Sequence, residues 1–154
     1  RSKERFRNRK PKARIELLIK QNRNSPNLVN KTSLIVKRLD STLGSIHGIG
    51  LTEYLVLNAL SSIPTQSLRR IDIAESLGKT ASGITRVLLP MEKTGLIIKE
   101  TKERDGRVSL VKITDAGTTT FQDANTTMQQ QCIQIFGNWN DKENKLMINL
   151  LNKI

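Results

Sequence analysis

The sequence predicts a mainly α-helical protein of the α+β class, in which long helices flank one small β-hairpin. In most of the 154-residue chain, apolar residues recur at the spacing of one helix face. Only residues 96–113 have the composition of two strands, and the Asp105-Gly106 pair between them is a turn signal. Glycines and prolines separate the segments at positions where helices commonly begin or end.

The N-terminal part of the chain is expected to be a basic arm, residues 1–24, that precedes a long helix. Within this arm, apolar residues at helical spacing predict a short helix over Ala13–Arg23. Ser25-Pro26 has the pattern of an N-cap followed by proline in the first turn. One apolar face then continues as far as His47, and the glycines that follow end this helix.

Three shorter helices are expected next. The first has Thr52 as its candidate N-cap and ends before Pro64. The second spans Arg70–Leu77, and the third runs from Thr80 to Thr94, each closed by a glycine. Apolar residues at i, i+3, i+4 and i+7 form the core-facing side of the third helix, namely Ile84, Val87, Leu88 and Met91.

The hairpin and two further helices complete the chain. Leu96–Glu100 and Ser109–Ile113 are the predicted strands. Thr114 is the expected cap of a helix over Asp115–Phe136, and a last helix covers Asp141–Lys153. The Asp115–Phe136 helix is rich in threonine, which has a low helix propensity, so packing of its apolar stripe must stabilise it.

The order of these elements indicates a DNA-binding arrangement. A short helix, a glycine-containing turn and a second helix with a polar N-terminal face match a helix-turn-helix, and the hairpin that follows is a wing. A rigid wing can place Arg104 and Arg107 in a narrow minor groove, and Asp105 can hold an arginine in a fork-like ion pair. The polar face of the second helix carries Ser82, Thr85 and Arg86.

A set of short segments also occurs in a recognisable order. These segments are LTEYLVL at 51–57, IDIA at 71–74, SGITR at 82–86, EKTGLI at 92–97, DGR at 105–107 and KITDAG at 112–117. From about Leu34 to Ile154 the chain resembles the MarR family, the multiple-antibiotic-resistance type of winged helix-turn-helix regulator of bacteria and archaea.

The resemblance implies specific roles for several residues. In that family the Thr80–Thr94 helix would be the recognition helix, and Arg107 would enter the minor groove with Asp105 orienting it. Arg104 and Arg70 are further candidates, for contact with phosphate. Four residues would face the major groove, namely Thr80, Ser82, Thr85 and Arg86. For the hydroxyl residues among them, helix capping or a plain surface position is the alternative.

The resemblance also implies an organisation of the whole chain. Residues 25–50 and 115–154 would form the dimerisation region of a homodimer, around a DNA-binding domain at 51–114. A small-molecule effector of unknown identity would bind between the two regions. The basic arm at 1–24 is longer than is usual in the family, and Pro90 removes a hydrogen bond inside the recognition helix. Cys132 is not in the N-terminal region where peroxide-sensing members carry their cysteine.

Composition supports a polyanionic partner. Lysine and arginine number 26 against 14 aspartate and glutamate residues, which gives a net charge of +12 and a pI near 10.3. Nucleic acid and an acidic membrane surface both fit this excess. Residues 1–23 alone hold ten basic and two acidic residues. The aromatic content of only 3% predicts a thin core, which a partner subunit would complete.

Several classes of protein are not expected. No apolar run approaches the length of a membrane span and no signal-peptide pattern occurs, so we expect a cytoplasmic protein without a membrane partner. One cysteine and one histidine predict no disulfide framework, no metal site and no cofactor. The sequence has no glycine-rich phosphate loop, nucleophile elbow or useful carboxylate pair, so no enzyme activity is expected.

The sequence therefore predicts a homodimeric, sequence-specific transcriptional regulator that binds double-stranded DNA and acts as a repressor. Two-fold symmetry predicts a pseudo-palindromic operator with half-sites about one helical turn apart. Two alternatives remain from the residues themselves. One is a winged-helix module that binds other proteins, and the other is a non-specific nucleic-acid binder in which the basic arm dominates.

Overall fold

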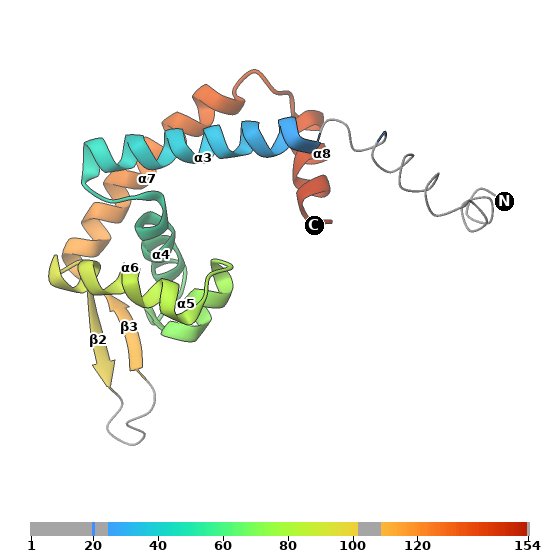
Figure 1. Ribbon diagram of the computed structural model, residues 1–154. Coiled ribbons are helices and arrows are strands. Elements are labelled where there is room, and N and C mark those ends of the chain that lie inside the picture. The colour runs from blue at the N-terminus through green and yellow to red at the C-terminus, as the bar shows by residue number, and fades with distance from the viewer. Residues whose placement is uncertain (1–19, 21–24, 102–108, 154) are drawn as a thin grey trace, which may run out of the picture. The chain divides into compact units, whose positions relative to one another are not determined.

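The computed structural model describes residues 20, 25–101 and 109–153. The chain divides into two compact units, residues 1–37 and residues 38–154, and the division falls inside the first long helix. In chain order the elements are α3 (Ser25–His47), α4 (Leu51–Ser61), β1 (Ser67–Arg69), α5 (Arg70–Ser76), α6 (Ala81–Lys93), β2 (Ile97–Thr101), β3 (Ser109–Ile113), α7 (Asp115–Phe136) and α8 (Asp141–Leu151). Figure 1 labels all of them except β1.

The mainly helical α+β class is confirmed, and each helix predicted after residue 24 is present. Thr80 and Thr114 cap α6 and α7 as expected, and each accepts a hydrogen bond of 3.0 Å, from Gly83 N and Gly117 N respectively. The short helix predicted over Ala13–Arg23 lies outside the described residues.

The predicted start of α4 is wrong. The N-cap is Gly50 and not Thr52, because two carboxylates bind the backbone N–H groups at this helix end. Glu53 Oε2 accepts from Gly50 N, and Asp40 Oδ1 accepts from Leu51 N at 2.7 Å. Asp40 belongs to α3, eleven residues before its partner, so no local sequence pattern indicates this cap.

The wing belongs to a three-stranded antiparallel sheet with the order β1-β3-β2, not to the two-stranded hairpin expected. The additional strand β1 pairs Leu68 with Val111, on the side of β3 opposite to β2. Because β1 has three residues, it has too little sequence for a period-2 pattern. Its pairing joins the segment before α5 to the base of the wing.

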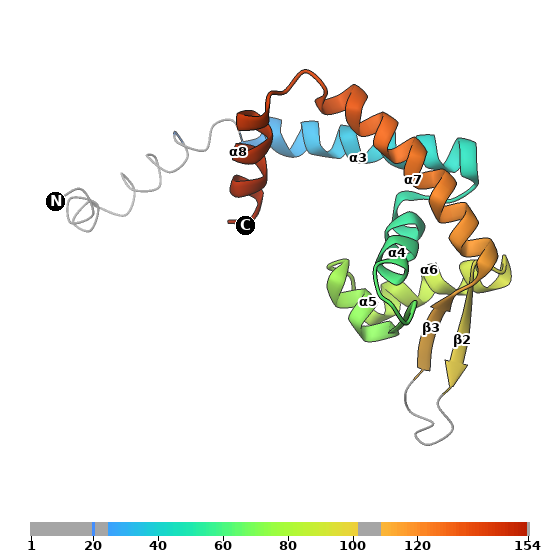
Figure 2. The same cartoon turned by 180° about the vertical axis from the view of Figure 1, so that it is seen from behind.

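One hydrophobic core holds the helix-turn-helix and the sheet together. Figure 2 shows α4, α5 and α6 gathered at the base of the β2–β3 ribbon, with α7 leading away from β3. The ring of Tyr54 in α4 stacks on Phe121 in α7 at a centroid distance of 5.7 Å. The largest fully buried side chains are Leu43, Val56, Leu57, Leu60, Ile73, Ile84, Leu88, Met91, Ile97 and Val111. These contacts fix the orientation of α6 relative to α5 and to the wing.

Candidate nucleic-acid interface

The solvent-facing side of α6 is opposite to its core side. Ile84, Leu88 and Met91 are buried, and this places the opposite stripe of the helix in solvent. That stripe consists of Ser82, Arg86, Leu89 and Lys93. It combines a hydroxyl, a guanidinium, an ammonium and an aliphatic side chain on one accessible face, which suits contact with base edges and phosphates.

Leu89 is a candidate contact that the sequence interpretation missed. It is 44% exposed although it is a large hydrophobic residue, and it follows Ser82 and Arg86 on the same stripe. The sequence spacing could have predicted this exposure, because Leu89 lies on the opposite side of the helix from Ile84 and Met91. An exposed aliphatic side chain on this face is suited to contact with a thymine methyl group.

The N-terminal end of α6 is organised by Thr80 and Ser82. Their two hydroxyl oxygens lie 3.2 Å apart, and Thr80 Oγ1 also accepts from the backbone N–H of Gly83. Thr80 is therefore a helix cap as well as a candidate contact. The first turn of α6 contains no acidic residue, so the positive end of the helix dipole is not neutralised there.

Thr85 and Arg70, which the sequence predicted as separate contacts, are hydrogen-bonded to each other. Arg70 Nη1 donates to Thr85 Oγ1 at 2.9 Å, and Thr85 Oγ1 donates to the backbone oxygen of Ala81 at 2.8 Å. Thr85 is only partly exposed and lies on the flank of α6, whereas Ser82 and Arg86 are exposed. The bond links the first residue of α5 to α6.

The adjacent arginine has a different partner. Arg69 Nε and Nη2 donate to the two carboxylate oxygens of Asp72 at 2.8 and 2.7 Å. This bidentate contact lowers the pKa of Asp72 and raises the pKa of Arg69, mainly through the hydrogen bonds. The charge of Arg69 is therefore locally balanced.

The described part of the wing is its base. There Lys99 forms an ion pair with Glu92 of α6, and Lys112 Nζ lies 3.4 Å from Glu100 Oε1. These lysines are paired with carboxylates on the protein itself, and the Lys99 pair joins β2 to α6. The predicted wing residues Arg104, Asp105 and Arg107 lie outside the described residues.

Other polar residues connect helices in the second unit. His47 Nε2 lies 2.8 Å from Thr127 Oγ1, and the hydroxyl of Tyr54 donates to Asn125 Oδ1 at 2.8 Å. Arg38 donates to the side-chain oxygens of Gln131 and Gln134. Each bond ties α3 or α4 to α7, so these residues have a structural function.

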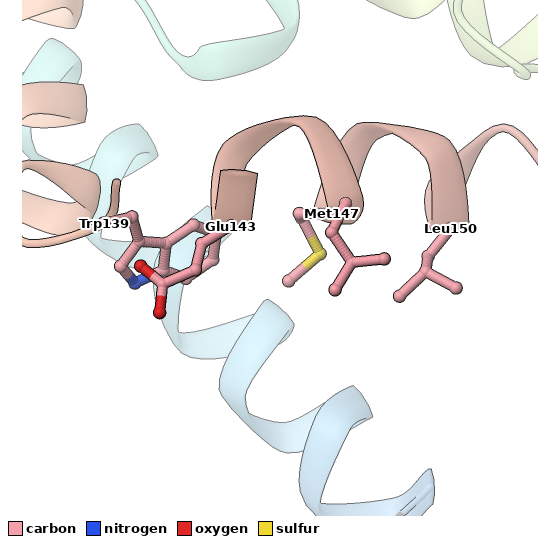
Figure 3. A pocket seen from close by; sticks show the side chains of 5 residues that line it. Trp139, Glu143, Met147 and Leu150 are labelled. Carbon is pink, nitrogen blue, oxygen red and sulfur yellow. The ribbon is translucent and has the colours of Figure 1, made fainter. Parts of the chain in front are cut away.

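A shallow, mostly apolar hollow of about 240 Å³ lies along α8. Figure 3 shows Trp139, Met147 and Leu150 on the same side of this helix. Because its lining comes from one helix and from Trp139, two residues before that helix begins, the hollow is an exposed apolar face rather than an enclosed ligand site.

The described residues show neither a metal-ligand cluster nor a membrane-spanning helix. Within residues 20, 25–101 and 109–153 no three His, Cys, Asp or Glu side chains are grouped as metal ligands. Over the same part of the chain, no helix has the length and apolar character that crossing a membrane requires.

Comparison with known proteins identifies the segment that contains this surface. The sequence pattern of the MarR family matches residues 49–109, the range that begins just before α4 and ends at the first residue of β3. These residues are a MarR-family segment. The candidate surface on α6 therefore lies within the segment that the MarR family pattern matches.

Solved structures of MarR proteins share the fold. A MarR family transcriptional regulator from Streptomyces coelicolor in complex with DNA matches at a TM-score of 0.79 and 20% identity, over 82% of this chain and 80% of that one. MepR of S. aureus, also in complex with DNA, matches at a TM-score of 0.75 and 19% identity, over 84% of this chain and 93% of that one. CouR from Rhodococcus jostii, bound to p-coumaroyl-CoA, matches at a TM-score of 0.72 and 18% identity, over 80% of this chain and 85% of that one. The chain thus has the MarR winged-helix fold.

Proposed function

We propose that this MarR-fold chain is a homodimeric, sequence-specific DNA-binding transcriptional repressor. The exposed stripe of α6 carries the proposal, because Ser82, Arg86, Leu89 and Lys93 share one face of the second helix of a helix-turn-helix. This helix lies inside the segment that the MarR family pattern matches. The relatives from S. coelicolor and S. aureus were both solved in complex with DNA, which supports the same partner here.

In this proposal α6 enters the major groove and the wing reaches the adjacent minor groove. Base contacts from the exposed stripe of α6 give sequence preference, while Thr80, at the start of the helix, contributes to its positioning on the backbone. Arg107, oriented by Asp105, provides the minor-groove contact, and Arg104 adds a phosphate contact from the same wing. A regulator of this kind works where the chromosome is, which in bacteria and archaea is the cytoplasm.

Homodimerisation is supported by apolar surface in the C-terminal helices. On α8 the side chains of Leu146, Leu150 and Leu151 are 50–58% exposed, and Ile133 of α7 is 69% exposed. Clustered exposed hydrophobic residues of this kind commonly mark a subunit interface. Residues 25–50 and 115–154 would then form the dimerisation region and residues 51–114 the DNA-binding domain.

Release by a small molecule is the remaining part of the proposal. CouR, one of the proteins that share the fold, was solved with p-coumaroyl-CoA bound. An effector of this chain would bind between the dimerisation region and the DNA-binding domain and favour a dimer geometry that does not fit the operator.

Selection of bound sequences from random duplexes, at physiological salt, tests the proposal. We expect wild type to enrich an inverted repeat and to retain a preference of roughly 10³-fold over random duplex. Arg107→Ala should enrich the same major-groove bases but lose affinity and the preference for flanking A·T pairs. Lys112→Ala is the matched control, since it removes a basic residue of the wing that is already paired with a carboxylate. The proposal is wrong if wild type enriches no sequence.

The rival function is non-specific binding driven by the basic arm. The ten basic residues among residues 1–23 favour it. Deletion of this segment separates the two, because a specific regulator should keep its sequence preference and show only a shallower dependence on salt. Loss of nearly all binding, with no preference in the remainder, would support the rival.

A further inference from the structure

Two adjacent arginines at the start of α5 have different chemical environments. Arg69 donates through Nε and Nη2 to both carboxylate oxygens of Asp72, so its charge is balanced locally. Arg70 instead donates to a neutral hydroxyl, that of Thr85. Among residues 20, 25–101 and 109–153, Arg70 has no ion-pair partner. Its positive charge is therefore available to an outside anion.

The hydroxyl of Thr85 has its only proton and one of its two lone pairs engaged in this arrangement. A hydroxyl has one proton and two lone pairs. The proton goes to the carbonyl oxygen of Ala81, at 2.8 Å, and one lone pair accepts from Arg70. Donation to a base would require breaking the bond to Ala81, in a helix side chain that is only partly exposed.

A guanidinium keeps most of its donors after such a bond. It has five N–H groups in a planar fork, and one of the Nη1 protons of Arg70 is used by Thr85. The remaining donors suit bidentate contact with phosphate oxygens. The bond to Thr85 restricts the side-chain rotamers before DNA arrives, which lowers the entropy cost of forming the contact.

The position of Arg70 indicates which part of DNA it meets. It is the first residue of α5, the first helix of the helix-turn-helix, and this helix crosses the DNA backbone when the second helix lies in the major groove. The DNA group nearest to Arg70 is therefore a backbone phosphate rather than a base edge.

Resting on the proposed function, we propose that Thr85 is a positioning residue that holds Arg70 for contact with a DNA phosphate, whereas Arg69 serves the fold. Thr85 then contributes to affinity through Arg70 and makes no base contact with its hydroxyl. Arg70 and Thr85 act as one unit that spans the two helices.

A double-mutant cycle on the selected operator tests this unit. Arg70→Ala should lower affinity about tenfold and reduce the slope of log affinity against log salt by about one. Thr85→Val, which replaces the hydroxyl with a methyl group, should lower affinity about threefold to tenfold. Thr85→Ser, which keeps the hydroxyl, should have an affinity within about twofold of wild type. Arg70→Ala with Thr85→Val should bind no more weakly than Arg70→Ala alone.

The neighbouring ion pair is the control. Removing it with Arg69→Ala and Asp72→Ala should leave the salt slope unchanged, and thermal unfolding checks that each variant is folded. If Thr85→Val costs as much without Arg70 as with it, Thr85 contacts DNA directly and this inference is wrong. If Arg70→Ala leaves the salt slope unchanged while base preference changes, Arg70 contacts a base and the inference is equally wrong. Failure of wild type to select any operator would instead overturn the proposed function itself.

Discussion

Tyr54 shows how a single polar side chain joins α4 to α7. It is the only tyrosine in the chain, it is buried, and its hydroxyl donates to Asn125 Oδ1. Burial, with a smaller contribution from Cys132, raises its pKa above the ordinary value of 10.0. No local sequence pattern indicates this hydrogen bond, because it depends on a residue 71 positions later.

Replacing Tyr54 with phenylalanine should destabilise the protein by about 1 kcal/mol near neutral pH, because the hydroxyl-to-amide hydrogen bond is lost. The difference should shrink as the pH rises above 10.0. In wild type the unfolded tyrosine loses its proton at lower pH than the folded one, so stability falls through that range. Phenylalanine has no proton to lose.

Urea unfolding of both proteins across this pH range measures the effect, and the absorbance of tyrosinate reports the titration of Tyr54 alone. A constant difference in stability between the two proteins from neutral to strongly alkaline pH would contradict the raised pKa.

At the scale of elements, the passage from the wing into α7 depends on one glycine. Thr114 Oγ1 donates to the backbone oxygen of Gly95 at 2.6 Å and also caps α7. A Cβ atom at Gly117 would lie 2.0 Å from the backbone oxygen of Leu96 and 2.9 Å from Ile113 Cγ1. The segment KITDAG therefore combines the end of β3, the helix cap and a close backbone contact, which gives a physical reason for its residue types.

Gly117→Ala should consequently destabilise the protein by about 1–3 kcal/mol, since an added methyl group has no room at this contact. Gly44→Ala is the control, because nothing lies within 4 Å of the added Cβ in the interior of α3. That change should stabilise by about 0.5–1 kcal/mol. Chemical denaturation of the two variants measures both, and equal stability of Gly117→Ala and wild type would show that the close contact with Leu96 does not form.

For the molecule as a whole, only part of the apolar stripe of α7 is exposed and can contact a second subunit. Phe121, Ala124 and Met128 pack against the chain's own core, while Ile133 further along is exposed. The intrachain packing stabilises the threonine-rich first half of the helix. The surface proposed for dimerisation therefore lies toward the end of α7 and on α8.

Leu146→Glu with Leu150→Glu should convert the proposed dimer to monomer without unfolding the subunit, because both side chains are at least half exposed in the single chain. Two carboxylates in an apolar interface would be buried without partners, and the free energy of this burial exceeds what the interface contacts contribute. Sedimentation equilibrium measures the assembly state. Asn149→Glu, at an exposed polar position of the same helix, should remain dimeric. A double variant that still forms dimers would place the interface elsewhere.

The sequence by itself determined the elements whose signals are local. Apolar spacing and threonine caps indicated α6 and α7, and strand composition gave β3 its observed bounds. The same spacing indicated the solvent-facing side of α6, with Ser82 and Arg86, because a helix buried on one side exposes the other. Short motifs in a fixed order indicated the MarR family, which the match at residues 49–109 confirmed.

Only the tertiary structure decided the features that join distant residues. Asp40 caps α4 from another helix, β1 pairs across the sheet with β3, and Thr85 binds the guanidinium of Arg70. Each contact depends on where the core places two segments, and neither segment alone has a pattern that indicates it. The different roles proposed for Arg69 and Arg70 have the same origin. Two adjacent arginines are alike in sequence, and only folding gives one a carboxylate partner and the other a hydroxyl partner.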